Sequence, residues 1–519
     1  MSRRTMTSVP RPGRDRRAVL HRAPAGAERA EGRRVVVIGG GIAGIAAATV
    51  LAERGVDVDL VEREHTWGGR ARSWDLGDGR SMSRGFHAFF RQYYTLRALL
   101  RRGDPSGSAL TGIGDYPLQL AGGPRDSFRG IPRTPPLSVA AFALRSRSFP
   151  VRQLARVDVP AALALLRADF PATFSRYDGV SAQTLLDELR FPHDARHLAL
   201  EVFARSFFAD PAEFSAGELV GMFHTYFMGS AEGLVFDVPV DAYSPALWDP
   251  LIAALCGHGA RARTGTRVVA VRPAADAVHV TGETDDFEVD AVVIAADPRG
   301  ARALLDTMPG PTRDSDAWRR RIRSQRNAPP FAVWRLWLDL PVAAAAPAFL
   351  GTSGYGPLDN VSVLERFEAT AARWSAAHGG SVLELHAYAL HEAEAQDPTA
   401  LRRELWHQLL RLHPELARAS AVHEEWIVHD DCPLIGTSPW AERPTVRSPD
   451  ERVVLAGDWL RTDEPVALME RAALTGVQAA NTLLSRWGVA GQDYWSVPLR
   501  GVLRGRGGTH GARRGRRQR

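Results

Sequence analysis

The sequence predicts an α/β protein with two domains, and three stretches of the chain support this prediction. Residues 34–62 read as a strand, a glycine-rich turn, a helix and a second strand. Residues 262–306 return to short apolar strand patterns, and residues 452–484 read as a strand, a Gly-Asp loop and a helix. Parallel strands joined through helices build one sheet from separated pieces of chain. With 519 residues, of which 45% are hydrophobic, the chain is long enough for this domain and another.

The predicted boundaries follow from where these patterns begin and end. The first domain takes residues 34–100, 245–306 and 425–488, and a second, α+β domain takes 101–244 and 307–424. Residues 1–34 carry ten arginines against three acidic residues, and residues 500–519 carry eight arginines and no acidic residue. Because apolar residues are sparse at both ends, we expect disordered basic tails at 1–33 and 489–519. Tails that bind acidic lipid or nucleic acid are the alternative.

The first stretch has the residues of a dinucleotide-binding turn. An apolar strand at 35–38 runs into three glycines spaced as G-x-G-x-x-G. These are Gly39, Gly41 and Gly44. The first permits a tight turn, the second lets the backbone approach a pyrophosphate, and the third lets the helix pack against the strand. The helix predicted at 42–54 begins with Ile42 and Ala43, whose free N–H groups can bind phosphate.

The second strand of this unit, at 56–61, ends at Glu62. An acidic residue roughly 20 positions past the glycines is where a carboxylate binds the hydroxyls of a ribose. Its neighbour Arg63 is a further candidate contact. A glycine-rich turn without a ligand is the alternative, but strand, helix, strand and acid all follow in the required order.

Six residues past Glu62 comes the sequence Gly68-Gly69-Arg70. A strand-end glutamate followed by G-G-R resembles the flavoprotein superfamily that contains the amine oxidases and the carotenoid desaturases. The resemblance implies a two-domain flavoprotein, with a Rossmann-type FAD domain of the glutathione-reductase/amine-oxidase type. It implies bound FAD rather than exchangeable NAD, with Gly69 close to the pyrophosphate and Arg70 in contact with a phosphate.

The C-terminal stretch carries a second set of cofactor candidates. Gly457 permits close approach of the backbone, and Asp458 can accept a hydrogen bond from a ribityl hydroxyl. We expect the backbone at Met469 to face the N1–C2=O edge of the flavin, because a helix N-terminus favours the negative charge of reduced flavin. A helix cap is the alternative for Asp458. In the middle stretch, Val268 lies where the family's strand pairs its backbone with adenine, and a core valine is the alternative.

Three further segments narrow the resemblance. They are RGFHAFFRQYYTLR at 84–97, SFFADPAEFSAGEL at 206–219 and PVALMERAALTG at 465–476. They resemble segments of the carotenoid desaturase family, above all of the actinobacterial β-carotene desaturase/methyltransferases. The resemblance implies an FAD-dependent oxidoreductase acting on CH–CH groups. It would desaturate β-ionone rings with a 1,2-methyl shift to give aromatic end groups, converting β-carotene to isorenieratene. A linear carotene desaturase or isomerase, an amine or alcohol oxidase and a flavin-binding scaffold without activity stay open.

Polar groups near these segments are the catalytic candidates. His87 matches the family histidine and is expected near the flavin, with a hydrogen-bonded core histidine as the alternative. Glu470, Asp241 and His224 are candidates for proton removal. Aromatic faces suit a pocket that stabilises a carbocation, although each aromatic residue is also an ordinary core residue. The aromatic candidates are Phe86, Phe89, Phe90, Tyr93, Tyr94, Tyr226 and Trp459.

Composition excludes several kinds of chemistry. Every basic residue other than histidine is arginine, which excludes a Schiff base and a lysine general base. Cys256 and Cys432 are too few for a disulfide framework or an iron–sulfur cluster, and they suit a reducing cytosol. We predict no metal site and expect Cys432 to be a free buried thiol.

A carotenoid substrate dissolves in lipid, so the enzyme should meet a membrane. No apolar run approaches transmembrane length, and no signal peptide is expected. Residues 131–170 mix apolar residues with arginines, as a lipid-facing patch does, and a core-facing helix pair is the alternative. We therefore expect a cytoplasmic protein that associates peripherally with the inner face of the cell membrane. We expect no nucleic-acid partner, and a quinone or oxygen as the electron acceptor.

Overall fold

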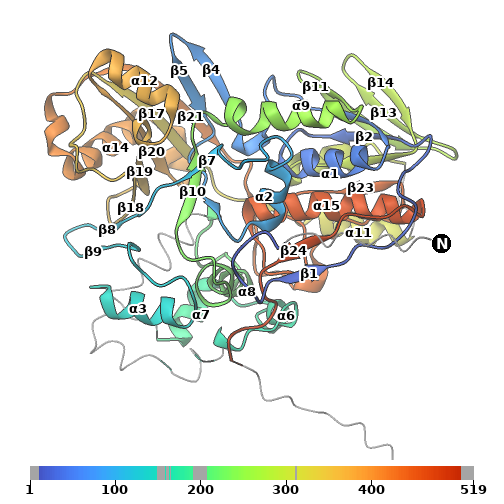
Figure 1. Cartoon of the computed structure of the whole chain (residues 1–519), viewed down its shortest axis with the longest axis horizontal. Helices are drawn as coiled ribbons and strands as arrows, with labels where there is room; N and C mark the ends of the chain where they lie inside the picture. The colour runs from blue at the N-terminus through green and yellow to red at the C-terminus, as the bar shows by residue number, and fades with distance from the viewer. Residues whose placement is uncertain are drawn as a thin grey trace, which may run out of the picture.

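A computed structural model describes residues 11–148, 158, 163, 165–190, 207–309 and 313–503. One domain is built on a parallel sheet with α1 and α15, and the other on a large antiparallel sheet flanked by α12 and α14 (Figure 1). Shorter helices lie in the lower part of this view, with α3 and α7 toward the left and α8 and α6 toward the centre. The α/β, two-domain prediction is therefore confirmed.

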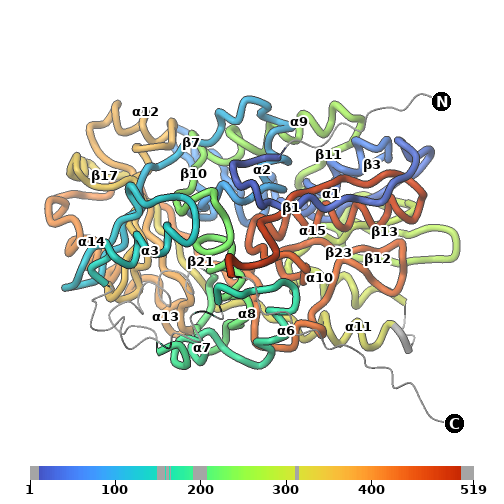
Figure 2. Tube along the Cα trace, turned by 60° about the horizontal axis from the view of Figure 1, so that its bottom comes forward, coloured from blue at the N-terminus to red at the C-terminus, as the bar shows by residue number. Residues whose placement is uncertain are grey.

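The first domain is a five-stranded parallel sheet in the order β11-β3-β2-β15-β23. Its strands are Arg261–Arg263, Asp57–Val61, Arg34–Ile38, Ala291–Ile294 and Val453–Leu455, in that order. Helices α1 (Ile42–Glu53) and α15 (Leu468–Arg486) pack side by side, as Figure 2 also shows. A Cβ at Gly476 would overlap the carbonyl oxygen of Ala43, so glycine lets these helices touch. Three separated stretches of chain thus form one sheet, as predicted.

Smaller elements surround this sheet. A meander of β12 (Val268–Pro273), β13 (Val278–Gly282) and β14 (Asp286–Val289) lies beside it. The helices around it are α2 (Tyr94–Leu100), α9 (Asp249–Gly257), α10 (Pro298–Leu305) and α11 (Arg313–Arg323). The two-stranded pairs are β4 (Ser73–Gly77) with β5 (Arg80–Ser83), and β16 (Arg326–Asn327) with β22 (Pro433–Leu434).

The second domain centres on a seven-stranded sheet in the order β21-β17-β20-β19-β18-β8-β9. Its strands are Ala421–His429, Phe331–Leu338, Ser381–Ala387, Asn360–Val363, Phe349–Ser353, Leu118–Leu120 and Arg125–Asp126, in that order. Only β18 and β8 pair in parallel within this sheet of the described chain. Because β21 pairs with β17, residues 425–429 belong to this sheet, and the predicted boundary at 425 was placed a few residues too early.

The sequence pattern at 331–340 and 381–390 predicts two half-buried strands, but the structure shows this to be wrong. All residues of β17 and β20 are buried. Helix α14 (Pro398–Leu412) packs on one face, while α12 (Ala369–His378) and β5 contribute to covering the other. The polar residues of these strands are buried because they pair with one another.

The region from 101 to 244 contains strands as well as the predicted helices. The described helices are α3 (Leu137–Arg145), α6 (Ala172–Arg176), α7 (Ala182–Glu188), α8 (Ala216–Phe223) and a π-helical turn (His224–Met228). Strands β6 (Phe89–Phe90), β10 (Phe236–Pro239) and β7 (Leu110–Gly112) form a small sheet. The sequence also predicts helices at 160–168 and 195–208, and most of these two segments lies outside the described residues.

The expectation that residues 1–33 and 489–519 form disordered tails was wrong for the parts that the structure describes. Strand β1 (Val19–His21) pairs with β24 (Tyr494–Ser496), which joins the two ends of the chain. Asp15 is buried, and its backbone N–H donates to Glu232 at 3.0 Å. Arg22 pairs with Asp493 at 2.7 Å. At least one of the arginines on which the prediction of disorder rested therefore has a specific ion-pair partner. Residues 1–10 and 504–519 are not among the residues that the structure describes.

Candidate active site

A cavity of about 590 Å³ lies between the two domains. One part is lined by the nucleotide-binding turns and the other by aromatic side chains. Of the predicted cofactor contacts, the lining includes Gly39, Gly41, Ile42, Ala43, Glu62, Arg63, Gly69, Arg70, Val268, Gly457, Asp458 and Met469. Gly44 does not line the cavity, because it packs against the turn. The structure thus brings three distant stretches of sequence to one cavity.

The glycine-rich turn leaves no room for side chains. Gly39 has φ +108°, a conformation that favours glycine, and its N–H donates to the carbonyl of Val61 at 2.8 Å. A Cβ at Gly44 would overlap the carbonyl oxygen of Gly39. A Cβ at Gly69 (φ +57°) would come within 3.0 Å of the Cα of Gly41. The cavity wall here is bare backbone at the N-terminus of α1, which suits a pyrophosphate.

Glu62 is 7% exposed and lies at the end of β3. Its Oε2 accepts the N–H of Gly40 at 2.6 Å and its Oε1 accepts the N–H of Glu64 at 2.9 Å. A carboxylate oxygen can accept more than one hydrogen bond, so both oxygens can also receive ribose hydroxyls. Arg63 is largely exposed and pairs with Glu64 at 3.3 Å, which places its charge at the edge of the cavity.

Arg70 and Asp458, predicted as separate contacts, form an ion pair of 2.5 Å. Burial alone would lower the pKa of Arg70, but the Asp458 carboxylate raises it, so the guanidinium is charged. Gly457 has φ +156°, and its N–H donates to Oγ1 of Thr475 on α15 at 3.0 Å. The ion pair therefore links the G-G-R turn to the Gly-Asp loop across the cavity wall.

Helix α15 begins at Leu468. Leu468 has φ +52°, an uncommon conformation for a residue with a side chain. Leu468 and Met469 both line the cavity. The sharp turn at Leu468 brings the N-terminus of α15 to the cavity, where the flavin edge is expected.

The aromatic part of the cavity contains several of the predicted residues. Phe86, Phe90, Tyr93 and Tyr226 line it, whereas Phe89, Tyr94 and Trp459 do not. Sequence reasoning did not connect further residues on β17 to β20 and their neighbours with the cavity. These are Tyr116, Phe207, Phe208, Phe236, Phe331, Phe349, Asn360, His386, Tyr388, Arg84, Asp431 and Cys432. The alternation of Glu, His and Tyr at 384–388 was the available signal. Cys432 is buried and free, as predicted.

His87 lines the cavity, and its Nδ1 lies 2.8 Å from the carbonyl oxygen of Gly85. Because a carbonyl only accepts, Nδ1 carries the hydrogen and Nε2 is left as an acceptor. Burial lowers the pKa of His87 to about 4, so the ring is neutral at neutral pH. Tyr243 contacts the ring edge-on.

The other acid–base candidates do not line this cavity. Glu470 accepts the backbone N–H groups of Thr95 and Leu96 at 2.8 and 2.9 Å, which caps the start of α2. Asp241 accepts the N–H of Thr370 at 2.9 Å in the first turn of α12. His224 is buried, with Nε2 2.5 Å from the carbonyl oxygen of Pro498. The geometry gives these three residues structural roles, because their polar atoms bind the protein backbone.

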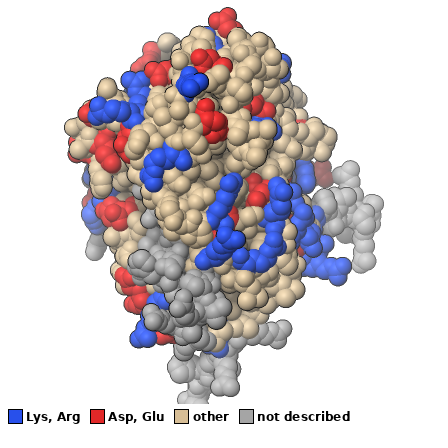
Figure 3. Space-filling model, turned by 90° about the vertical axis from the view of Figure 1, so that its left-hand side faces the viewer, with Lys and Arg blue, Asp and Glu red and all other residues tan. Residues whose placement is uncertain are grey.

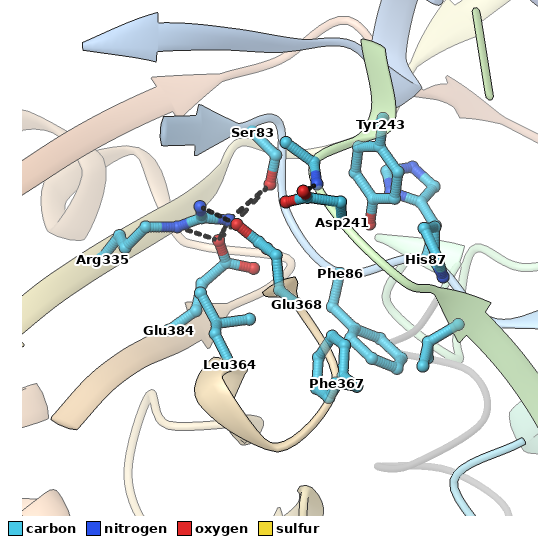
Figure 4. A pocket seen from close by; sticks show the side chains of 13 residues that line it. Ser83, Phe86, His87, Asp241, Tyr243, Arg335, Leu364, Phe367, Glu368 and Glu384 are labelled. Carbon is cyan, nitrogen blue, oxygen red and sulfur yellow. Dashed lines mark hydrogen bonds and ion pairs between the residues drawn. The ribbon is translucent and has the colours of Figure 1, made fainter. Parts of the chain in front are cut away.

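A buried cluster of charges lies behind the cavity wall (Figure 4). The guanidinium of Arg335 lies 2.6 Å from Glu384 and 3.4 Å from Glu368, and it donates to Ser83 at 2.9 Å. His87 and Phe86 line both the main cavity and a void of about 10 Å³ beside this cluster. The void has room for about one water molecule. The cluster therefore joins the sheet of the second domain to β5 and to the cavity.

The sequence was compared with known protein families. Residues 42–484 match the model of the flavin containing amine oxidoreductases. The chain belongs to this family. The nucleotide-binding turns of this chain are therefore those of an FAD site, and the protein is an FAD-dependent oxidoreductase. The FAD fits the wall described above, where bare glycines, the Glu62 carboxylate and two helix N-termini meet.

Two relatives of this chain are named for carotenoid chemistry. A carotenoid phi-ring synthase of Streptomyces griseus is 53% identical over 95% of this chain and 96% of its own. A carotenoid phi-ring synthase of Chlorobaculum tepidum is 24% identical over 91% of each chain. Putrescine oxidase has the same fold, with a TM-score of 0.64 at 16% identity, covering 88% of this chain and 99% of that structure. These matches support the carotenoid desaturase family that the sequence motifs predicted.

Proposed function

We propose that the protein desaturates β-ionone rings and moves one methyl group to the neighbouring carbon, which gives aromatic end groups. The observation that carries this proposal is the extent of the matches. The relative named for a carotenoid ring product matches 95% of the chain, whereas a Synechocystis zeta-carotene desaturase matches 13% of it. A ring substrate is therefore favoured over an acyclic one.

The cavity suits this reaction. FAD, when bound, would supply a hydride acceptor. Removal of hydride from the ring leaves a carbocation conjugated with the polyene, and a 1,2-methyl shift moves the charge before a proton is lost. A second oxidation, which removes another hydride and another proton, completes the aromatic ring. Phe86, Phe90 and Tyr226 line the cavity and offer aromatic faces to a cation. His87 is neutral, so it adds no positive charge that would oppose the cation. The methyl group comes from the ring itself, and no external methyl donor is required.

Expression in cells that accumulate β-carotene tests the proposal. We expect pigments that have lost hydrogen with no change in carbon number and that carry aromatic end groups by mass spectrometry and absorption. Conversion of an acyclic precursor with β-carotene left unchanged would instead establish a linear desaturase. Oxidation of an amine would instead establish an amine oxidase. The chain contains no lysine, so such an enzyme would work without a lysine beside the flavin. Reoxidation of the flavin under anaerobic conditions with and without a quinone distinguishes quinone from oxygen.

We further propose that the protein docks on anionic membrane through α3. Leu137 and Leu144 on this helix are 64% and 80% exposed. Exposed arginines lie on α3 and near it in the sequence, namely Arg125, Arg129, Arg133, Arg145 and Arg147. Arginine side chains gather into a band on the face in Figure 3, the left-hand side of Figure 1, where β8, β9 and α3 lie. Within the described chain, no helix is long and apolar enough to span a bilayer. Residues 149–157 of the predicted patch, which include Phe149 and Leu154, lie outside the described residues.

A stack of aromatic rings connects this patch with the cavity. Phe142 of α3 stacks on Phe128 at 4.8 Å between ring centroids, and Phe128 stacks on Tyr116 at 4.3 Å. Tyr116 lines the cavity. A hydrocarbon chain leaving lipid at α3 would therefore meet apolar rings along its path.

The double variant L137D/L144D tests the membrane site. Because each leucine contributes about 1.5–3 kcal/mol when its side chain enters an apolar phase, we expect vesicle affinity to fall at least about tenfold. Flotation with anionic liposomes measures this. V422D is the matched control, since Val422 is 49% exposed on β21 at the opposite edge of the sheet. Equal flotation of the α3 variant and the control would contradict the proposed site.

A further inference from the structure

A polar array on β20 and its extension faces the cavity. Glu384, His386 and Tyr388 alternate along the chain, so their side chains point to one side of the sheet. His386 and Tyr388 line the cavity together with Asn360 of β19. Glu384 lies behind them and is 1% exposed. This array reaches from the charge cluster of Figure 4 to the cavity surface.

The hydrogen bonds of the array have a defined direction. Burial raises the pKa of Glu384, but Arg335 and His386 lower it to about 2, so the carboxylate is ionised. Its Oε1 lies 2.8 Å from Nε2 of His386, and an ionised carboxylate only accepts. In the tautomer that donates to Glu384, the hydrogen of His386 is on Nε2, which also lies 3.3 Å from the backbone nitrogen of Phe86, and Nδ1 accepts from the Tyr388 hydroxyl at 2.5 Å. Asn360 donates to the same hydroxyl oxygen at 3.1 Å.

We propose that Tyr388 accepts the proton that the substrate ring loses, with His386 and Glu384 as its positioning residues. The inference rests on the proposed function. In this step the ring C–H bond breaks and its electron pair becomes the new C=C bond. The proton bonds to the Tyr388 oxygen as the hydroxyl's own proton passes to Nδ1 of His386. The resulting imidazolium faces the Glu384 carboxylate, and the step needs no further oxidant or reductant.

The other histidine of the cavity is less suited to holding this proton. His87 contacts the carbonyl of Gly85, and no ion pair joins it to a carboxylate in the part of the chain that is described. A positive charge on His386, by contrast, lies directly beside Glu384. A paired carboxylate favours the charged form of a histidine, so the proton is better held on the β20 array.

The variant Y388F tests the proposal, because it removes the hydroxyl and keeps the ring that packs against Phe208. Flavin bleaching is followed after the holoenzyme is mixed anaerobically with β-carotene in vesicles. Product formation is followed separately in turnover with a quinone or oxygen as electron acceptor, because each aromatic ring requires two oxidations and one flavin accepts one hydride. General-base catalysis contributes about 10²–10⁴-fold, so we expect product formation to fall at least about 100-fold. Flavin bleaching in the first turnover should stay within about threefold of wild type, since hydride leaves before the proton. In E384Q we also expect product formation to fall while flavin bleaching is retained, but the loss of product formation should be smaller than in Y388F.

Y355F is the matched control. Tyr355 is a buried tyrosine that packs between the sheet and α14, away from the cavity. We expect Y355F to behave as wild type. Unchanged product formation in Y388F would overturn the assignment, and so would an equal loss of bleaching and product, which indicates substrate positioning. If wild type makes no aromatic product, the proposed ring reaction fails. The same two measurements are then made on the acyclic carotene that it does convert.

Discussion

Replacing Gly44 by alanine should leave the purified protein colourless. A Cβ at this position would overlap the carbonyl oxygen of Gly39 and approach the Cβ of Ala295 at 3.2 Å. The overlapped atom is backbone, so the start of α1 must move away from β2. Overpacking of this kind costs about 1–3 kcal/mol. Because the same helix turn forms the phosphate-binding wall, we expect FAD affinity to fall roughly ten- to hundredfold.

Flavin absorbance per mole of protein after gel filtration measures this effect, with thermal unfolding as a check on the fold. G257A is the matched control. Gly257 ends α9, and a Cβ there meets no atom within 4 Å. The control should keep its yellow colour and its melting temperature. A G44A protein with the flavin content of wild type would show that the turn does not carry the cofactor.

Replacing Arg335 by methionine should produce the largest loss of stability. The side chain is 2% exposed and is placed between Glu384 and Glu368. Its removal leaves two buried carboxylates without their cation. Breaking a buried ion pair in this way costs about 3–5 kcal/mol. We expect this decrease in the free energy of unfolding, measured by denaturant titration.

The variant R402M is the control for this experiment. Arg402 pairs with Glu424 at 3.0 Å, but its side chain is 34% exposed. An exposed pair contributes about 0–1 kcal/mol, so little change is expected. Comparable losses in both variants would contradict the assignment of Arg335 as the centre of a buried cluster.

The pH dependence of the free energy of unfolding is a second test of the charge cluster around Arg335. Glu384 has a pKa of about 2 in the folded protein, below the usual value of about 4.3 for glutamate in an unfolded chain. The group therefore adds stability above the unfolded pKa, and this contribution is lost as the pH falls toward 2. In R335M the main cause of the lowered pKa is absent. The acid-dependent decrease in stability over this range should be correspondingly smaller.

The cofactor domain could be predicted from the sequence alone, because the residues that form the nucleotide-binding turn are close together in the sequence. Gly39, Gly41 and Gly44 must stand next to one strand and one helix, and Glu62 must end the next strand. Such spacing is visible in the chain before it folds. The Gly457-Asp458 loop was predicted for the same reason. The carotenoid family followed from the short segments around His87 and Met469.

Only the tertiary structure decided which polar residues face the cavity. Glu470 and Asp241 have suitable chemistry, but long-range packing brings each to the backbone at the start of a helix, where it accepts N–H groups. β20 is a buried central strand, and His386 at its end and Tyr388 just beyond it line the cavity. The strand's alternation fixes which residues share a face, but not which face meets the cofactor domain. That choice depends on contacts between segments hundreds of residues apart, such as Arg335 with Ser81, which no local pattern in the sequence encodes.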